Sequence, residues 1–63
     1  MWIAVYWARD RQTAEQIQHH LYSAGVLVKI QSMDRDRSEN CFEILVEQND
    51  VEKAHKIIID EGF

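Results

Sequence analysis

Residues 2–7 are all apolar or aromatic, and polar residues follow them. A short run that is rich in β-branched and aromatic side chains is typical of a β-strand. Strand alternation divides the run into two sets, one of Ile3, Val5 and Trp7 and the other of Trp2, Ala4 and Tyr6. Because neither set is polar, we expect both faces of this strand to be covered, the second face by another subunit.

After residue 10 the apolar positions recur every three or four residues, which predicts a helix over 11–24. Asp10 is the expected N-cap, and Gly25 suits the left-handed position that ends a helix. A capping box of Thr13 and Gln16 is an alternative that would begin the helix about one turn later. The predicted buried stripe consists of Ala14, Ile17, Leu21 and Ala24.

Two further strands are predicted, over 26–31 and 41–47, because apolar residues alternate with other residues in both segments. The inward set is Val26, Val28 and Ile30 in the first strand and Phe42, Ile44 and Val46 in the second. The outward set is Leu27, Lys29 and Gln31 in the first and Glu43, Leu45 and Glu47 in the second. The charged segment 33–40 between them is expected to be a loop.

The last predicted element is a capped helix that begins within Asn49-Asp50-Val51-Glu52-Lys53-Ala54 and ends near residue 60. Asn49 and Glu52 form a plausible capping pair at its start. Its apolar stripe consists of Val51, Ala54 and Ile58.

This element order predicts an α+β fold in one domain over 1–63: a ferredoxin-like β-α-β-β-α plan that lacks the fourth strand. We expect a three-stranded mixed sheet with both helices on one face, joined by a right-handed crossover. The strand 41–47 would be central, with 26–31 antiparallel to it and 2–7 parallel to it. Strand 2–7 would then be an edge strand with unpaired backbone groups.

Two segments resemble a known family. The first is Glu43-Ile44-Leu45-Val46 followed by Asp50-Val51-Glu52-Lys53-Ala54, and the second is Ala14-Glu15 leading to Leu21 and Gly25-Val26. Both are similar to small prokaryotic domains classed as signal-transducing proteins of unknown function. The resemblance covers nearly the whole chain, and its motifs are mostly structural. Such domains usually have proline where Glu47 stands here. The resemblance implies a small bacterial α+β domain without known catalytic residues.

Charge and cysteine content narrow the classes of partner. The net charge is −4, which disfavours nucleic acid and anionic membranes because both need a positive surface. Cys41 is the only cysteine, so an intrachain disulfide is not possible, and self-association is a remaining source of stability. Residues 1–7 do not resemble a signal peptide or a membrane span, so we expect a cytoplasmic protein.

The residues that carry chemistry do not form a recognisable site. His19 and His20 are adjacent on a helix and point about 100° apart, so they cannot share one metal from one face. His55 and Cys41 lie on other elements, and we expect no metal site and no cofactor. Asp34, Asp36, Ser38 and Asn40 alternate as in a calcium loop, but Glu39 occupies the position that needs glycine.

The sequence also contains no glycine-rich phosphate loop and no set of nucleophile, base and orienting residue. We therefore expect a protein without enzymatic activity of its own.

The predicted site is the sheet face that the helices leave uncovered. Its expected interaction residues are Trp2, Tyr6, Leu27, Glu43 and Leu45. One hypothesis is a regulatory or protein-interaction domain that acts as a homodimer or adaptor through this face and the edge strand. The alternative is a sensor of a small anionic metabolite, with Lys29 and the arginines of the segment 33–40 as anion contacts.

Overall fold

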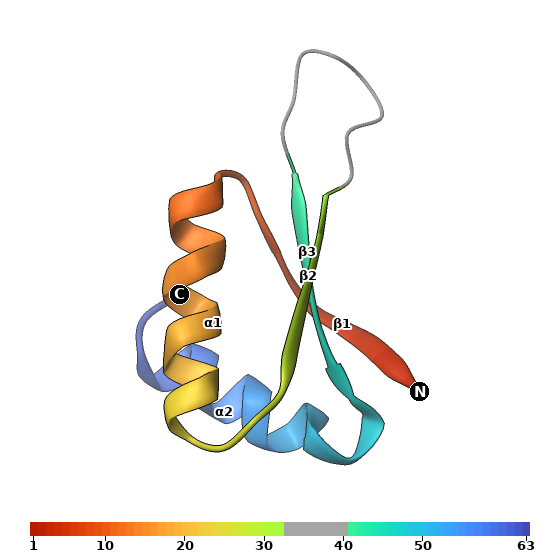
Figure 1. Ribbon diagram of the computed structural model, residues 1–63. Helices are drawn as coiled ribbons and strands as arrows, with labels where there is room; N and C mark the ends of the chain where they lie inside the picture. The colour runs from red at the N-terminus through yellow and green to blue at the C-terminus, as the bar shows by residue number, and fades with distance from the viewer. Residues whose placement is uncertain (33–40) are drawn as a thin grey trace.

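The fold was analysed in a computed structural model, which describes residues 1–32 and 41–63 (Figure 1). Three strands and two α-helices follow one another in the order β-α-β-β-α, and a single 3₁₀ turn precedes the second helix. The elements are β1 (Trp2–Ala8), α1 (Arg11–Ser23), β2 (Val28–Ser32), β3 (Phe42–Glu47), η1 (Gln48–Asp50) and α2 (Val51–Asp60). This confirms the predicted α+β fold class and places each predicted element within a few residues of its expected bounds.

The sheet has the order β1-β3-β2, so β3 is the central strand, as predicted. Both neighbours of β3 pair with it antiparallel, however, so the predicted mixed sheet and the predicted parallel pairing of the first strand are wrong. The reason is topological. The crossover through α1 makes β1 and β2 run in the same direction, and β3 reverses direction after β2 before it inserts between them. A strand inserted there must oppose both neighbours.

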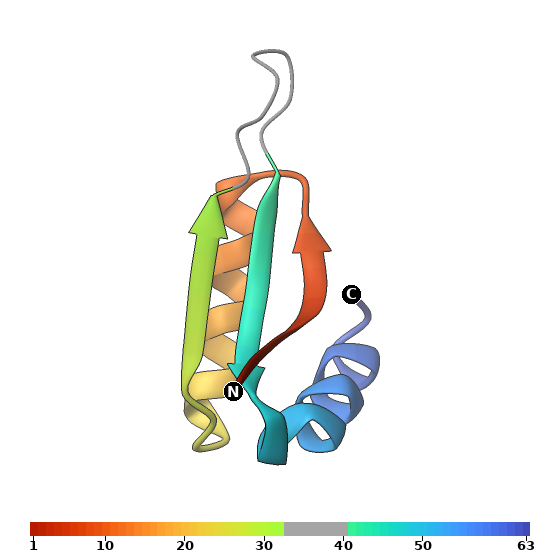
Figure 2. The ribbon, with the colours of Figure 1, turned by 90° about the vertical axis from the view of Figure 1, so that its right-hand side faces the viewer.

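The core lies between the sheet and the two helices (Figures 1 and 2). Ala14, Ile17 and Leu21 of α1 and Ala54 and Ile58 of α2 are buried against the sheet. In Figure 2, α1 lies behind β2 and β3, α2 lies beside and below β1, and no element covers the side of the sheet that faces the viewer. One face of the sheet therefore carries the whole core of the described residues.

The ends of α1 show why it forms where it does. The backbone N–H of Thr13 donates to the Asp10 side chain at 2.7 Å, which confirms Asp10 as the N-cap in place of the alternative capping box. At the other end, Gly25 has φ +86°, and the N–H of Val26 donates to the Leu21 carbonyl at 2.9 Å. This is a Schellman closure, in which glycine accepts a backbone conformation that other residues resist.

The start of α2 differs from the prediction. The helix begins at Val51, directly after the 3₁₀ turn, and no side chain caps it by a hydrogen bond. The predicted capping pair of Asn49 and Glu52 is therefore wrong, because Asn49 lies inside the 3₁₀ turn and not at the residue that precedes the helix.

Candidate interaction face

A β-bulge in β1 determines which side chains reach the uncovered face. Ala4 is opposite Leu45, and Tyr6 is opposite Ile44, so Val5 is an extra residue in the pairing with β3. Paired residues of an antiparallel ladder share a face, and an extra residue reverses the alternation beyond it. After the bulge, Tyr6 therefore joins the core face, and Trp7 joins the uncovered face.

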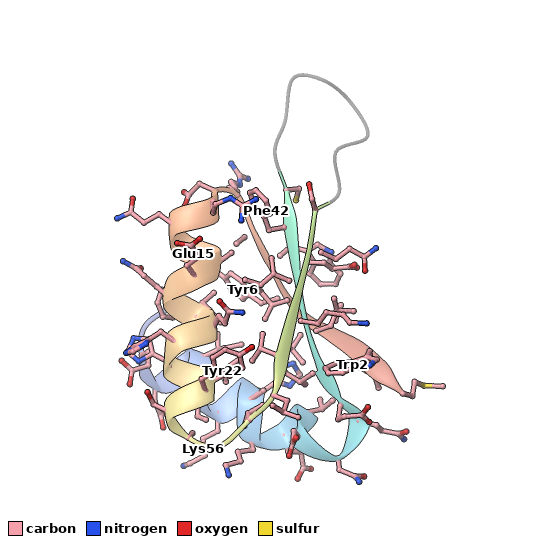
Figure 3. The ribbon with its side chains drawn as sticks, viewed as in Figure 1. Trp2, Tyr6, Glu15, Tyr22, Phe42 and Lys56 are labelled. Carbon is pink, nitrogen blue, oxygen red and sulfur yellow. The ribbon has the colours of Figure 1, made fainter. Side chains whose placement is uncertain are left out.

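The outcome corrects the predicted faces of the first strand. Tyr6 is partly buried and packs against the core, and Figure 3 shows it between the sheet and α1. Trp7 has 55% of its surface exposed. The predicted site thus included Tyr6, which lies on the other face, and omitted Trp7. The one signal in the sequence was that both alternating sets of this strand are apolar, so the pattern could not fix its phase.

We call the uncovered surface the open face. It consists of Trp2, Ala4 and Trp7 of β1, Glu43, Leu45 and Glu47 of β3, and Leu27, Lys29 and Gln31 at β2. Figure 3 shows Trp2 on the side of the sheet away from α1. Leu27 directly precedes β2, between the buried residues Val26 and Val28, and alternation places it on the outward side. The structure therefore brings together four of the five predicted site residues.

The open face is apolar at its margins. Trp2, Trp7 and Leu27 have 38%, 55% and 67% of their surfaces exposed. Leu45 is half-buried at the centre, between Ala4 on one neighbouring strand and Lys29 on the other. Two indoles and a leucine side chain therefore remain in contact with water. For so small a domain, covering them would contribute a large hydrophobic free energy.

Cations and carboxylates are arranged differently at the two tryptophans. Trp2 is opposite Glu47, and the Nζ of Lys29 lies 4.9 Å from the centroid of the Trp2 ring. The Glu47 carboxylate also lies 3.0 Å from the amino group of Met1. At this end of the face, both the aromatic ring and the carboxylate have a cation.

Trp7 is opposite Glu43 in the same ladder. Within residues 1–32 and 41–63, no cation lies over the Trp7 ring, and no ion pair or hydrogen bond engages the Glu43 carboxylate. Glu43 is half-buried beside Gln31 of β2. The second tryptophan–glutamate pair is therefore opposed across the ladder like the first, but the described residues supply no cation to it.

The histidines and Cys41 do not converge. His20 of α1 lies 3.7 Å from the Glu61 carboxylate and 5.9 Å, between ring centroids, from Phe63, so it links α1 to the end of α2. His19 and His55 are exposed, and Cys41 is half-buried. In the described part of the chain, no three histidine, cysteine or acidic side chains are grouped as a metal site would require. The predicted charged loop over 33–40, with its calcium-like alternation, lies outside the described residues.

The fold perturbs the protonation of Asp10. The hydrogen bond from the Thr13 backbone N–H favours the carboxylate and lowers the pKa of Asp10 below its usual value. This group lies at the start of α1, not on the open face, so the shift concerns stability.

Across the described ranges, no pocket is found, and neither helix has the length and apolar character needed to cross a membrane. Comparisons with protein-family models, curated proteins and solved structures give no match for this chain.

Proposed function

We propose that this chain is a small regulatory or adaptor domain without catalytic activity, which acts by docking a protein on its open face. The partner is a second copy or another protein, and the adjacent edge of β1 extends the contact. The observation that supports the proposal most directly is the exposure of Trp2, Trp7 and Leu27 on one side of a sheet whose other side is buried. The signalling role and cytoplasmic location implied by the sequence belong to the same proposal.

The composition of the open face fits protein docking. Tryptophan is enriched among the residues that dominate binding energy, and it buries about 150–250 Å² when it is covered. At about 25 cal/mol per Å², covering the exposed parts of two indoles contributes a few kcal/mol before the cost of association. The half-buried carboxylates of Glu43 and Glu47 supply polar contacts beside them.

The alternative of a metabolite sensor receives less support. It needs Lys29 as an anion contact, but the Lys29 ammonium lies over the Trp2 ring, and its neighbours across the ladder include acidic side chains of β3. The arginines that it also needs lie outside the described residues. A thermal-shift screen with nucleotides, amino acids and 2-oxo acids checks it, since a ligand that binds the folded state must raise the melting temperature.

Site-specific photo-cross-linking in living cells tests the docking proposal. A benzophenone amino acid at position 45 is expected to give a discrete cross-linked product, with a second copy or with another protein, and Trp7→Ala is expected to abolish it. The matched control places the same group at Gln16, which is exposed on α1. Equal products from both positions, or none from position 45, would contradict the proposal.

A further inference from the structure

We propose that Trp7 and Glu43 form a receptor for an arginine side chain, carried by a short basic segment of a partner protein. The guanidinium group would lie over the Trp7 ring and donate hydrogen bonds to the Glu43 carboxylate. The inference rests on the proposed function, because it names the chemistry of the partner that the open face accepts.

At the other end of the open face, a cation of the chain already lies over a tryptophan ring, and a second cation pairs with the opposite glutamate. Trp2 and Glu47 are opposite each other, and the Lys29 ammonium is 4.9 Å from the Trp2 ring centroid. Trp7 and Glu43 are also opposite each other, in the same pair of strands. Within the described residues, no cation accompanies them. One end of the open face therefore supplies its own cations, whereas the described residues supply none at the other end.

The chemistry of Trp7 and Glu43 suits a guanidinium group. Side chains directly opposite in an antiparallel ladder have Cβ atoms about 5 Å apart, so one group can touch an indole ring and a carboxylate together. A planar guanidinium suits both contacts, because it stacks on an aromatic ring and donates two parallel hydrogen bonds to a carboxylate. Glu43 is half-buried, so solvent weakens its attraction for a cation less than at a fully exposed site.

The size of the open face suits a single bound segment. Three strands spaced about 4.8 Å apart and roughly six residues long present a projected area of about 300 Å². A helical segment, which is about 10 Å wide, covers most of that footprint.

The negative charge of the open face and of the whole chain favours a basic partner. Two copies packed face to face would oppose their central strands, each of which carries Glu43 and Glu47. The whole chain has a net charge of −4, which further disfavours self-association and favours a basic partner. Arginine on the incoming segment would neutralise the one carboxylate of the open face that has no cation among the described residues.

The test uses nuclear magnetic resonance of the two indole N–H groups, since the chain has only two tryptophans. The probe is the peptide acetyl-Leu-Arg-Val-Arg-Leu-amide, and its control replaces both arginines with citrulline, which has a similar shape and no charge. We expect a saturable shift of the Trp7 signal with the arginine peptide and binding about tenfold weaker with the citrulline peptide. Equal binding of the two peptides would overturn the arginine receptor.

Two matched variants localise the effect. Glu43→Gln is expected to weaken binding of the arginine peptide about five- to tenfold, whereas Glu47→Gln should change it less than about twofold. Equal losses from both substitutions would show a general charge effect and overturn the proposal. Arg35 and Arg37, in the segment outside the described residues, are the cations nearest to Glu43 in sequence. Unchanged or tighter binding by Arg35→Ala/Arg37→Ala supports a partner's arginine as the ligand, and lost binding contradicts it.

The two proposals fail separately. If the Trp7 signal does not respond to the arginine peptide, but position 45 still gives a discrete cross-link, docking on the open face stands and the arginine receptor is wrong. If both experiments fail, the docking function is wrong as well.

Discussion

The two faces of β3 differ in what they contribute, although they alternate along one strand. Phe42, Ile44 and Val46 point to the helices and are at most 6% exposed, whereas Glu43, Leu45 and Glu47 are only half-buried on the open face. The same six residues thus build the core and the candidate site. Substitutions at neighbouring positions should therefore separate stability from binding.

The largest effect is expected from a cavity on the covered face. Ile44→Ala should lower the free energy of unfolding by about 2–5 kcal/mol, because Ile44 is fully buried at the centre of the sheet. A domain of 63 residues has about 3–9 kcal/mol in total, so much of the variant would unfold. Leu45→Ala, its neighbour on the open face, should cost about 1 kcal/mol or less. Urea denaturation followed by circular dichroism measures both, and equal losses would contradict the comparison.

A smaller loss should follow from disturbing the helix that covers this face. Gly25→Ala is expected to cost about 1–2 kcal/mol, because alanine resists the positive φ of +86°. No atom lies within 4 Å of the position that its Cβ would take, so the cost is conformational and not steric. Gly25→Asn should lose less, since asparagine tolerates this conformation better. If asparagine and alanine destabilised the domain equally, the backbone explanation would fail.

The N-cap of the same helix should make stability depend on pH. The folded-state pKa of Asp10 is lowered, so its stabilisation is present above the usual pKa of 3.8 and is lost as pH falls through the lower folded value. Asp10→Ala should lower the melting temperature by a few degrees at pH 7, and the difference from the parent should shrink below about pH 3. Asp10→Ser keeps a capping oxygen without the charge, and its difference from the parent at pH 7 should be smaller. If the melting temperature of Asp10→Ala lay below that of the parent by the same amount at pH 7 and at pH 2.5, this account would be contradicted.

The smallest effect is expected on the open face itself. Lys29→Met removes the cation from the Trp2 ring and should cost about 0.5–1 kcal/mol at this exposed site. Its clearer readout is spectroscopic: the Trp2 indole signal should move, and the Trp7 signal should stay in place. Movement of both signals to the same extent would show a global change of the sheet.

The sequence was most informative where one local rule dominates. Asp10 marks the start of α1 and Gly25 marks its end, as predicted, because a cap oxygen and a left-handed glycine act within one turn of the chain. The faces of β3 were also predictable, because acidic residues alternate with apolar ones at Glu43 and Glu47. These features need no knowledge of distant contacts.

Prediction failed where two segments must be matched to each other. The phase of β1 depends on its register against β3, and an extra residue at Val5 places both Val5 and Tyr6 on the core side. The mixed sheet was wrong for a different reason, because β3 was correctly expected between the other two strands. The crossover makes β1 and β2 run in the same direction, so a strand that is antiparallel to β2 must also be antiparallel to β1. For the candidate site, the result was that Leu45 and Trp2 were found, and Trp7 was missed.

The bulge at Val5 also limits what can pair with the free edge of β1. Trp2 and Trp7 are separated by five positions, an odd number, yet they lie on one face. A regular strand that pairs with this edge can match the hydrogen-bonding pattern of β1 on only one side of the bulge. Each side therefore offers only a few consecutive residues for pairing. An apolar edge of this kind would otherwise be a template for stacking chain upon chain into fibrils. The irregularity that places Trp7 on the open face is therefore expected to protect the chain from aggregation.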